Sequence, residues 1–408
     1  MIGAPAFVAA WLSLPLMAAP STSLDLAARS ETRVRIPGDQ GIDTKAEPSS
    51  YDWELGATSN LLIDFRDTKI QVGYAPRFSF NDFTHQAVRN LWQTGTFGIA
   101  WLWPRVQLSL TETAAYGDRY FSALSNVSSA DPATGTLVLQ ALPRSTSVRD
   151  VSSDTALKSS LAMTRRTSLD FLLGYQLGGG IDAESRAIVP FFTASRALTS
   201  LDYKLTQHDT ISTLVQGLYT RTSSPIPPEI HLFVGKVGET WRRQWGKGTS
   251  TTFGAGVAVI PAYTLSDSLQ VRPTGLATVT HAFSAGPNHG QVQLGAVGGV
   301  DVVVDRLTGI ADTRAQIGAN GAWAVQKWTF SSQVTHARSL TAQPNSLALT
   351  TGEVRVSLHV TKPITLDGAV RILQQKALEP VAGTPPLAAG FQWGALVAFS
   401  YHFDLVEL

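Results

Sequence analysis

The side chains that could do chemistry in this sequence are charged residues that recur within segments of alternating polar and apolar character. In the stretch "GEVRVSLHV", Glu353 and Arg355 alternate with Val354 and Val356. Successive side chains of a β-strand point to opposite faces, so such charges share one face. Rows of arginine and acidic side chains on one face are typical of a water-filled conduit, where they set selectivity. The residues that we assign to a pore lining on this basis are Arg29, Arg33, Asp64, Arg77, Arg105, Lys158, Asp170, Arg196, Asp301, Arg314, Glu353, Arg355, Asp367 and Arg371.

Each of these residues also has a simpler interpretation. A wide wall that faces water carries mixed charge whether or not it selects a solute. The selectivity interpretation therefore rests on the whole set and not on any single position.

Catalytic and metal-binding patterns are absent from the sequence. There is no cysteine, which excludes disulfides, thiolate nucleophiles and Cys-based metal sites. The 8 histidines show neither HxxxH nor HExxH spacing, and there is no GxSxG motif or P-loop. The glycine-rich "LGGGIDAE" at Leu177 lies in a link with no helix expected after it, which argues against a phosphate cradle. His231, His281 and Asp305 could form a rim site, but any long chain offers such combinations. We predict no enzyme, no metal and no cofactor.

The composition points away from an ordinary soluble domain and from nucleic acid. Lys+Arg number 32 and Asp+Glu number 31, so the net charge of +1 gives no basic field for nucleic acid. Only 15% of residues are charged, well below the roughly 25% of soluble domains. The chain therefore has few charged residues with which to cover a soluble surface, while tryptophan, tyrosine and phenylalanine are plentiful.

The N-terminus resembles a secretory signal peptide. The segment from Ala4 to Ala19 carries no charge and ends in small residues, although no lysine or arginine precedes it. The alternative is a buried N-terminal helix. We expect residues 1–19 to be the signal and residues 20–408 to be the mature chain. No other apolar run reaches the ~18 residues that a transmembrane helix needs.

Period-two alternation runs through almost the whole remaining chain, in segments of about 12–16 residues. Strands of soluble proteins average about 5–6 residues, whereas membrane strands need about 9–11 for the hydrocarbon alone. A large β-sandwich or a β-solenoid is the alternative. Aromatic residues near segment ends suggest interfacial girdles and favour a membrane barrel. Those that we expect to face the membrane are Trp53, Trp101, Trp103, Trp323, Trp328, Trp393, Phe399, Tyr401 and Phe403.

The links between segments alternate in length. Short links, such as Arg66–Thr68 and Lys362–Pro363, alternate with longer ones rich in glycine, proline and serine. A weak segment, "SLDLAARSETRVRI" from Ser23, gives the first well-defined segment a partner and makes the strand count even. We predict about 18 strands, with 16 as the fallback.

This pattern resembles Gram-negative outer-membrane β-barrels, among them the large porin-like pores. The resemblance implies an all-β fold: a single transmembrane antiparallel up-and-down barrel with short periplasmic turns and longer outer loops. It further implies an outer-membrane location, and as partners outer-membrane lipid and the barrel-assembly machinery. The closing segment "FQWGALVAFSYHFD" is similar to the assembly signal of such barrels, although five residues follow Phe403.

The longest outer link, Tyr120–Asp150, is the third outer loop, and in porins the third loop folds into the lumen. Here the loop contains few acidic residues, so it would narrow the lumen without supplying the acidic half of a charge clamp. A surface loop, or a hairpin that extends the wall, is an equal alternative.

Three functions fit these features. The first is a pore through which hydrophilic solutes, expected to be saccharides, diffuse across the outer membrane. The alternative is an outer-membrane conduit that exports a polysaccharide together with periplasmic export components. The third is a structural or adhesive barrel without transport, against which the mostly short, small-residue-rich outer loops argue.

Overall fold

The fold is described from a computed structural model of the chain. The residues described are 21–37, 50–81, 88–121, 128–130, 137–139, 146–223, 229–264, 266–285, 290–341, 346–377, 390–403 and 406–407. The expected signal peptide, residues 1–19, lies outside these ranges and stays a prediction.

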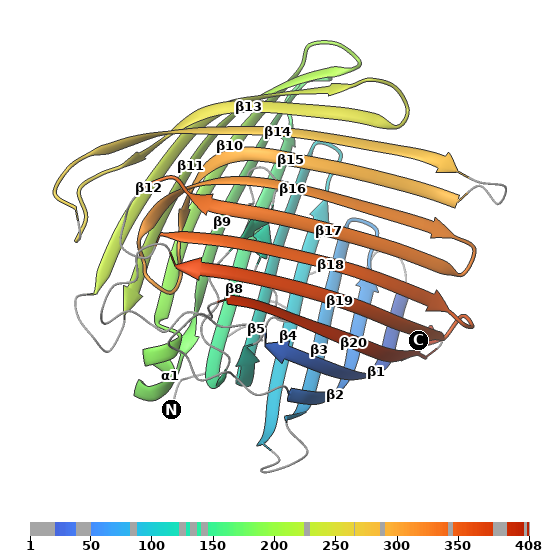
Figure 1. Ribbon diagram of the computed structural model, residues 1–408. Helices are drawn as coiled ribbons and strands as arrows, with labels where there is room; N and C mark the ends of the chain where they lie inside the picture. The colour runs from blue at the N-terminus through green and yellow to red at the C-terminus, as the bar shows by residue number, and fades with distance from the viewer. Residues whose placement is uncertain are drawn as a thin grey trace, which may run out of the picture.

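Long antiparallel strands form a closed 18-strand β-barrel (Figure 1). These are β1 (Ser21–Pro37), β2 (Ser50–Asp64), β3 (Thr68–Asn81), β4 (Val88–Leu102), β5 (Val106–Phe121), β8 (Thr146–Ala162), β9 (Thr167–Gly180), β10 (Phe191–Lys204), β11 (Asp209–Ser223), β12 (Ile230–Gln244), β13 (Thr249–Ile260), β14 (Gln270–Ala285), β15 (Gly290–Val304), β16 (Ala311–Val325), β17 (Trp328–Ser339), β18 (Leu347–His359), β19 (Ile364–Ala377) and β20 (Gly390–His402). Each strand pairs with its neighbours in the chain, which confirms the predicted up-and-down barrel and its strand number.

The barrel closes where the first strand meets the last long one. β1 pairs with β2 on one side and with β20 on the other, in a register that runs from Ala27↔His402 to Pro37↔Gln392. The short β21 (Val406–Glu407) extends this seam by pairing with Ser23 and Leu24 of β1. The weakest predicted segment is therefore the strand that completes the cylinder, because closure leaves no sheet edge unpaired.

The two ends of the barrel differ. At one end, the short-turn end, strands are joined by tight links such as residues 65–67, 103–105 and 326–327. At the other, the long-loop end, the links include residues 38–49 and 378–389. Figure 1 shows the strands running between these two ends with a pronounced tilt, as closure of a twisted sheet requires.

The outer face is apolar, and much of it is exposed. Ile317 and Val397 are 66% and 63% exposed, and large apolar side chains stand out on strands around the barrel. A soluble protein rarely exposes a continuous apolar band of this kind. Hydrogen bonds between neighbouring strands pair the backbone of the closed wall, as a barrel that crosses a membrane requires.

Aromatic rings lie on this outer face near both ends. Trp53 stacks on Phe80 with ring centroids 5.2 Å apart, and Trp323 stacks on Phe330 at 5.5 Å. Tyr401 and Phe403 meet edge to face at 4.8 Å. Of the other expected aromatics, Trp101, Trp328, Trp393 and Phe399 lie in strands on the outer parity, and Trp103 lies just past the end of β4. Aromatic residues therefore lie on the outer face towards both ends of the barrel, and their contact with the membrane interface stays a prediction.

Helix is almost absent from the described part of the chain. One short helix, α1 (Ala183–Ile188), begins after Asp182, whose side chain accepts a hydrogen bond from the Ser185 amide at 2.7 Å. The expectation that no helix follows "LGGGIDAE" is therefore wrong. Asp182 is the N-cap of this helix, and aspartate is a preferred N-cap residue that can be recognised in the sequence. No helix among the described residues has the length and apolar character needed to cross a membrane.

Two further short strands, β6 (Ser128–Ala130) and β7 (Leu137–Leu139), pair only with each other. They fall within the loop that was expected to narrow the lumen, residues 120–150. Most of that loop lies outside the described residues, so its folding into the lumen stays a prediction. Its two ends belong to the wall, as the end of β5 and the start of β8.

Candidate functional site

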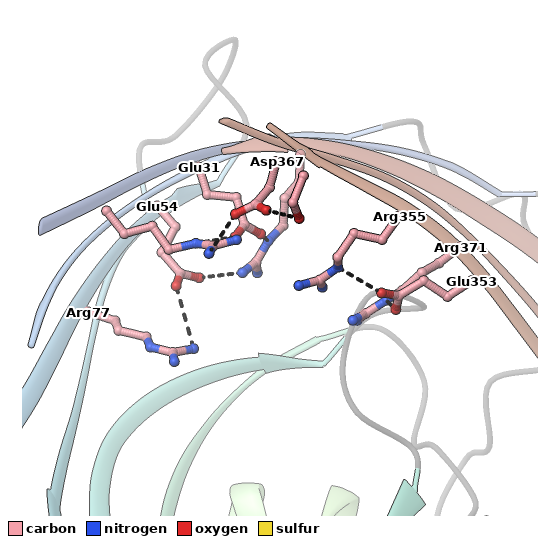
Figure 2. A network of polar contacts seen from close by, with 10 residues as sticks. Glu31, Glu54, Arg77, Glu353, Arg355, Asp367 and Arg371 are labelled. Atoms are coloured by element: carbon pink, nitrogen blue, oxygen red, sulfur yellow. Dashed lines mark hydrogen bonds and ion pairs between the residues drawn. The ribbon is translucent and has the colours of Figure 1, made fainter. Parts of the chain in front are cut away.

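The inner wall beside the seam carries a network of arginines and carboxylates. Figure 2 shows these side chains projecting into the barrel interior. β1, β2 and β3 supply one part of the network, while β18 and β19 supply the other. The arginines are Arg29, Arg33, Arg77, Arg355 and Arg371, and the carboxylates are Glu31, Glu54, Glu353 and Asp367.

Glu31 is the centre of the first part. It is only 6% exposed, and it accepts hydrogen bonds from Arg33 and from Arg29, the latter at 3.0 Å. Arg29 also reaches Asp367 on β19 at 3.2 Å, across the closing strand β20. Arg33 continues to Glu54 at 2.8 Å, and Arg77 lies 3.7 Å from Glu54. The chain of ion pairs thus ties the first three strands to the last ones across the seam.

Glu353 is the centre of the second part. It accepts from Arg355 at 3.0 Å and from Arg371 on the neighbouring strand. The two parts are separated by β20, whose inward-facing Leu396 and Ala398 are buried and carry no charge. Because all nine charged groups alternate in sign and are largely paired, the wall is polar without a strong net field.

A recess of about 590 Å³ opens beside this network. Its lining includes Arg29, Glu54, Arg77, Arg355 and Asp367. Charged and hydroxyl groups at such a surface offer many donors and acceptors to a hydroxyl-rich solute, since a paired arginine keeps further N–H groups free to donate.

The opposite wall is partly covered by the tip of the hairpin that β15 and β16 form. The last pair between β14 and β15 joins Gly275 to Val300, and beyond it the hairpin pairs only with itself and β17. Its tip packs against strands that are not its neighbours in the sheet. Val302, Val304 and Ala311 form one apolar cluster with Phe192 and Ala194 of β10, Leu232 and Val234 of β12, and Ala258 and Ile260 of β13.

This cluster lies on the inner face of the wall. Directly opposed residues of paired strands point to the same side, so the register carries the lumenal face from Arg77 round to β10 and β12. Lys236 of β12 meets Asp301 of β15 at 2.7 Å, skipping the two strands between them. Such a contact is possible only across the concave interior, so the hairpin tip, residues 301–314, folds into the lumen.

Arg306 at the tip reaches furthest. Its guanidinium donates to Gln176 of β9 at 2.8 Å and lies 5.6 Å from the centre of the Phe192 ring. The turn closes at Gly309, whose positive φ of 69° and close approach to Thr222 leave no room for a side chain. The tip therefore fits its site on the inner wall closely.

Arg314 holds the base of the folded-in hairpin. Its side chain is only 5% exposed and pairs with Asp305 at 3.0 Å and with Asp312 at 2.8 Å. Asp312 also accepts from Ser339 of β17. A buried charge is stable only when paired and hydrogen-bonded, so these contacts fix the bend of the hairpin.

The predicted pore-lining residues occupy several kinds of site. Arg29, Arg33, Arg77, Glu353, Arg355, Asp367 and Arg371 form the seam network, while Asp64, Lys158, Asp170, Arg196 and Asp301 lie on the inner parity elsewhere. Two positions differ from the expectation. Arg314 is buried beneath the hairpin tip, and Arg105 lies exposed in the turn between β4 and β5.

Several residues of the seam network and of the hairpin contacts were absent from the sequence-based set. Glu31 and Glu54 share parity with Arg29 and Arg33, so alternation alone is signal enough to find them. Lys236 likewise has a parity signal within β12. For Arg306 no such signal exists, because a residue in a link has no face until the loop folds.

Among the described residues, no group of three or more histidine, aspartate or glutamate side chains could hold a metal ion. The polar lumen offers paired charges and hydroxyl groups, which suits passage of a hydrophilic solute. Comparison with known families narrows the class. Residues 14–383 match the EpsX exopolysaccharide export family. The chain belongs to this family. It is a transport protein and not an enzyme.

Solved structures align with this EpsX-family member over most of its chain. The FrpB iron transporter from Neisseria meningitidis aligns with a TM-score of 0.50 and 8% identity, over 93% of this chain and 82% of that one. OpdQ from Pseudomonas aeruginosa aligns with a TM-score of 0.46 and 9% identity, over 94% of this chain and 97% of that one. Identities this low bear on the fold alone. No curated protein sequence matches the chain significantly.

Proposed function

We propose that this EpsX-family barrel is an outer-membrane conduit through which an exopolysaccharide leaves the cell. The observation that carries the proposal is the combination of an apolar outer face with an inner wall of paired charges around an open recess. The outer face suits lipid, while the inner face suits a solute that forms hydrogen bonds.

Family membership favours export over the passive uptake of small saccharides. A polymer that moves along a wall needs many weak and equivalent contacts, because tight sites would hold it in place. The alternating arginines and carboxylates of the seam network have this character. Each arginine is already paired, so it can donate to a sugar hydroxyl without binding it strongly.

The folded-in hairpin tip narrows the conduit. In this proposal the tip, residues 301–314, limits the bore at the long-loop end, and the polymer passes between it and the seam network. The short-turn end then faces the periplasm, and the polymer enters the barrel there. Periplasmic export components act with the barrel at this end.

Two measurements test the proposal. The purified barrel should conduct ions in a planar bilayer, and a strain without it should lose surface exopolysaccharide. Re-expression of the chain should restore the polymer. A barrel that stays electrically silent, or a deletion strain with all its polymer still displayed, would rule the proposal out.

A third measurement separates export from diffusion. Small sugars added to the bilayer chamber should reduce conductance only weakly, whereas polymer fragments should block it in discrete events. Strong block by a single small sugar would favour the diffusion pore instead.

A further inference from the structure

One patch of the outer wall is polar at mid-depth, where a membrane strand normally presents apolar side chains to lipid. It lies on β3, β4, β5 and β8, which are side by side in the sheet (Figure 1). Glu112 is at its centre, near the middle of the 16-residue β5. About 9–11 residues of a membrane strand cross the hydrocarbon, so this depth is remote from both interfaces.

The strand register places Glu112 on the outer face. Ser109 of β5 pairs with Lys158 of β8 on the lumenal side, so Glu112 and its partner Thr155, which have the opposite parity, face outward. The Glu112 carboxylate accepts hydrogen bonds from Ser153 at 2.6 Å and from Thr155. Both hydroxyls belong to β8, so the carboxylate leans towards that strand. A carboxylate in hydrocarbon is costly even with two such partners, and the patch therefore needs an explanation.

The other side of the patch carries donors. Tyr74 of β3 donates a hydrogen bond to Oε1 of Gln93 on β4 at 2.8 Å. Because that oxygen is engaged, the amide nitrogen is the end of Gln93 that can donate to a partner. The patch thus has two unlike halves. We call Glu112, Ser153 and Thr155 the acceptor half, and Tyr74 and Gln93 the donor half.

A floor of small residues separates the two halves. Gly95 of β4 pairs with Ala114 of β5, and the same row continues to Tyr74 on one side and to Ser153 on the other. A Cβ atom on Gly95 would meet only the carbonyl oxygen of Ala114, at 4.0 Å, so packing within the wall does not demand glycine there. Glycine inside a strand often marks the close approach of another backbone, and small residues have this role at interfaces within membranes.

Lipid is a poor occupant of this patch. An acyl chain can neither donate nor accept a hydrogen bond, so it would leave both halves unanswered. Another outward carboxylate, Glu239, lies two residues from Trp241, at the level of the aromatic residues. Glu112 lies four residues beyond Leu108, the partner of Trp101, and so is deeper in the membrane. An occupant with donors and acceptors at this depth must itself be a membrane protein.

We propose that this polar patch pairs two copies of the barrel side by side in the membrane. A two-fold axis along the membrane normal, passing through the Gly95–Ala114 floor, sets the acceptor half of each copy against the donor half of the other. Such an interface uses the same surface twice and closes with two copies, whereas a ring of three would need a second contact surface on each barrel. The pairing is independent of what passes through the two lumens.

Cysteine crosslinking tests the proposal directly. The chain contains no cysteine, so a single introduced cysteine reports one position only. A residue beside a two-fold axis meets its own copy, so A114C should form a disulfide-linked pair in oxidised membranes. V397C, which is 63% exposed near the middle of β20, is the matched control. The yield of pairs should be about tenfold or more higher for A114C than for V397C.

Substitutions in the A114C background decide whether the patch holds the pair. E112L removes the acceptor and offers lipid an apolar side chain, so the crosslink yield should fall about tenfold. E239L makes the same change on the outer face of β12 and should leave the yield unchanged. G95L fills the floor and should also lower the yield, while the open space at Gly95 lets the single barrel fold. Heat-modifiable migration checks that each variant assembles.

Three outcomes would overturn the proposal. They are a yield for A114C no higher than that for V397C, a crosslink to a different protein in place of a second copy, and a yield that neither E112L nor G95L lowers. Conductance per barrel of E112L should equal that of the wild type, because the residue faces away from the lumen. Loss of pairing with normal conductance therefore bears on the patch alone, and an electrically silent barrel that still pairs bears on the conduit alone.

Discussion

The seam network and the base of the folded-in hairpin are built from the same ion pair, arginine with carboxylate, in opposite surroundings. Arg77 of the seam network is 56% exposed and lies 3.7 Å from Glu54. Arg314 of the hairpin base is 5% exposed and lies within 3.0 Å of both its partners. Exposed pairs contribute little to stability, whereas breaking a buried pair is strongly destabilising. The exposed part of the seam network is therefore suited to meet a solute, whereas the fully buried pairs of the hairpin base are suited to hold the structure.

The comparison predicts which wall controls the bore. In the seam network Arg29 and Arg33 each have a second carboxylate partner besides Glu31, so one charge can change while the wall keeps its shape. The buried ion pairs of the hairpin base cannot lose one partner without a movement of the hairpin. Substitutions in the hairpin base should therefore alter how much passes through the barrel, and substitutions in the seam network should alter what passes.

Removal of the buried cation should have the largest effect. R314A leaves Asp305 and Asp312 buried without their counterion, which costs about 3–5 kcal/mol against the folded-in hairpin. We expect the hairpin to leave the lumen and single-channel conductance to rise. R338A, on the exposed outer parity of β17, is the control. Normal heat-modifiable migration of both variants would show that the barrel still assembles, and unchanged conductance of R314A would contradict the lock.

Loss of the apolar contact should have the next largest effect. Leu232 is 1% exposed in the cluster that receives the hairpin, and truncation of such a side chain costs about 2–5 kcal/mol. L232A should therefore give intermittent openings of higher conductance in bilayer recordings. L366A removes an outward leucine that is 40% exposed and should leave the recordings unchanged. Equal behaviour of the two variants would mean that the cluster does not hold the hairpin.

The sequence predicts the wall far better than it predicts the obstruction. Alternation fixes which face of a strand is apolar, because a slip by one residue would turn every side chain to the wrong side. Trp53, Trp393 and Arg29 therefore follow from parity alone. Val302 and Val304 share the apolar parity of β15, yet they pack inside the barrel because the hairpin leaves the wall after Val300. Nothing local in the sequence marks that departure, since it depends on contacts with strands more than forty residues away.

In the seam network, loss of one carboxylate should change selectivity without changing the bore. E31Q removes the negative charge that Arg29 and Arg33 share, so one positive charge in the wall becomes uncompensated. The reversal potential under a salt gradient should shift towards anions, with conductance close to that of the wild type. E239Q changes an exposed carboxylate on the outer parity of β12 and is the control. A shift of the same size in E239Q would show that the field comes from the barrel as a whole.

The smallest effect should come from the most exposed cation of the seam network. R77Q removes a charge whose pairing with Glu54 is long and open to solvent, so its contribution to stability is about 0–1 kcal/mol. Glu54 keeps Arg33 as a partner at 2.8 Å, so no carboxylate is stranded. The reversal potential should move towards cations, opposite in sign to E31Q and smaller, because water already screens Arg77. Since the two substitutions remove opposite charges from one connected network, E31Q/R77Q should return close to the wild-type value. A double variant that keeps the full shift of E31Q would mean that the ion pairs act on the solute separately and not as one surface.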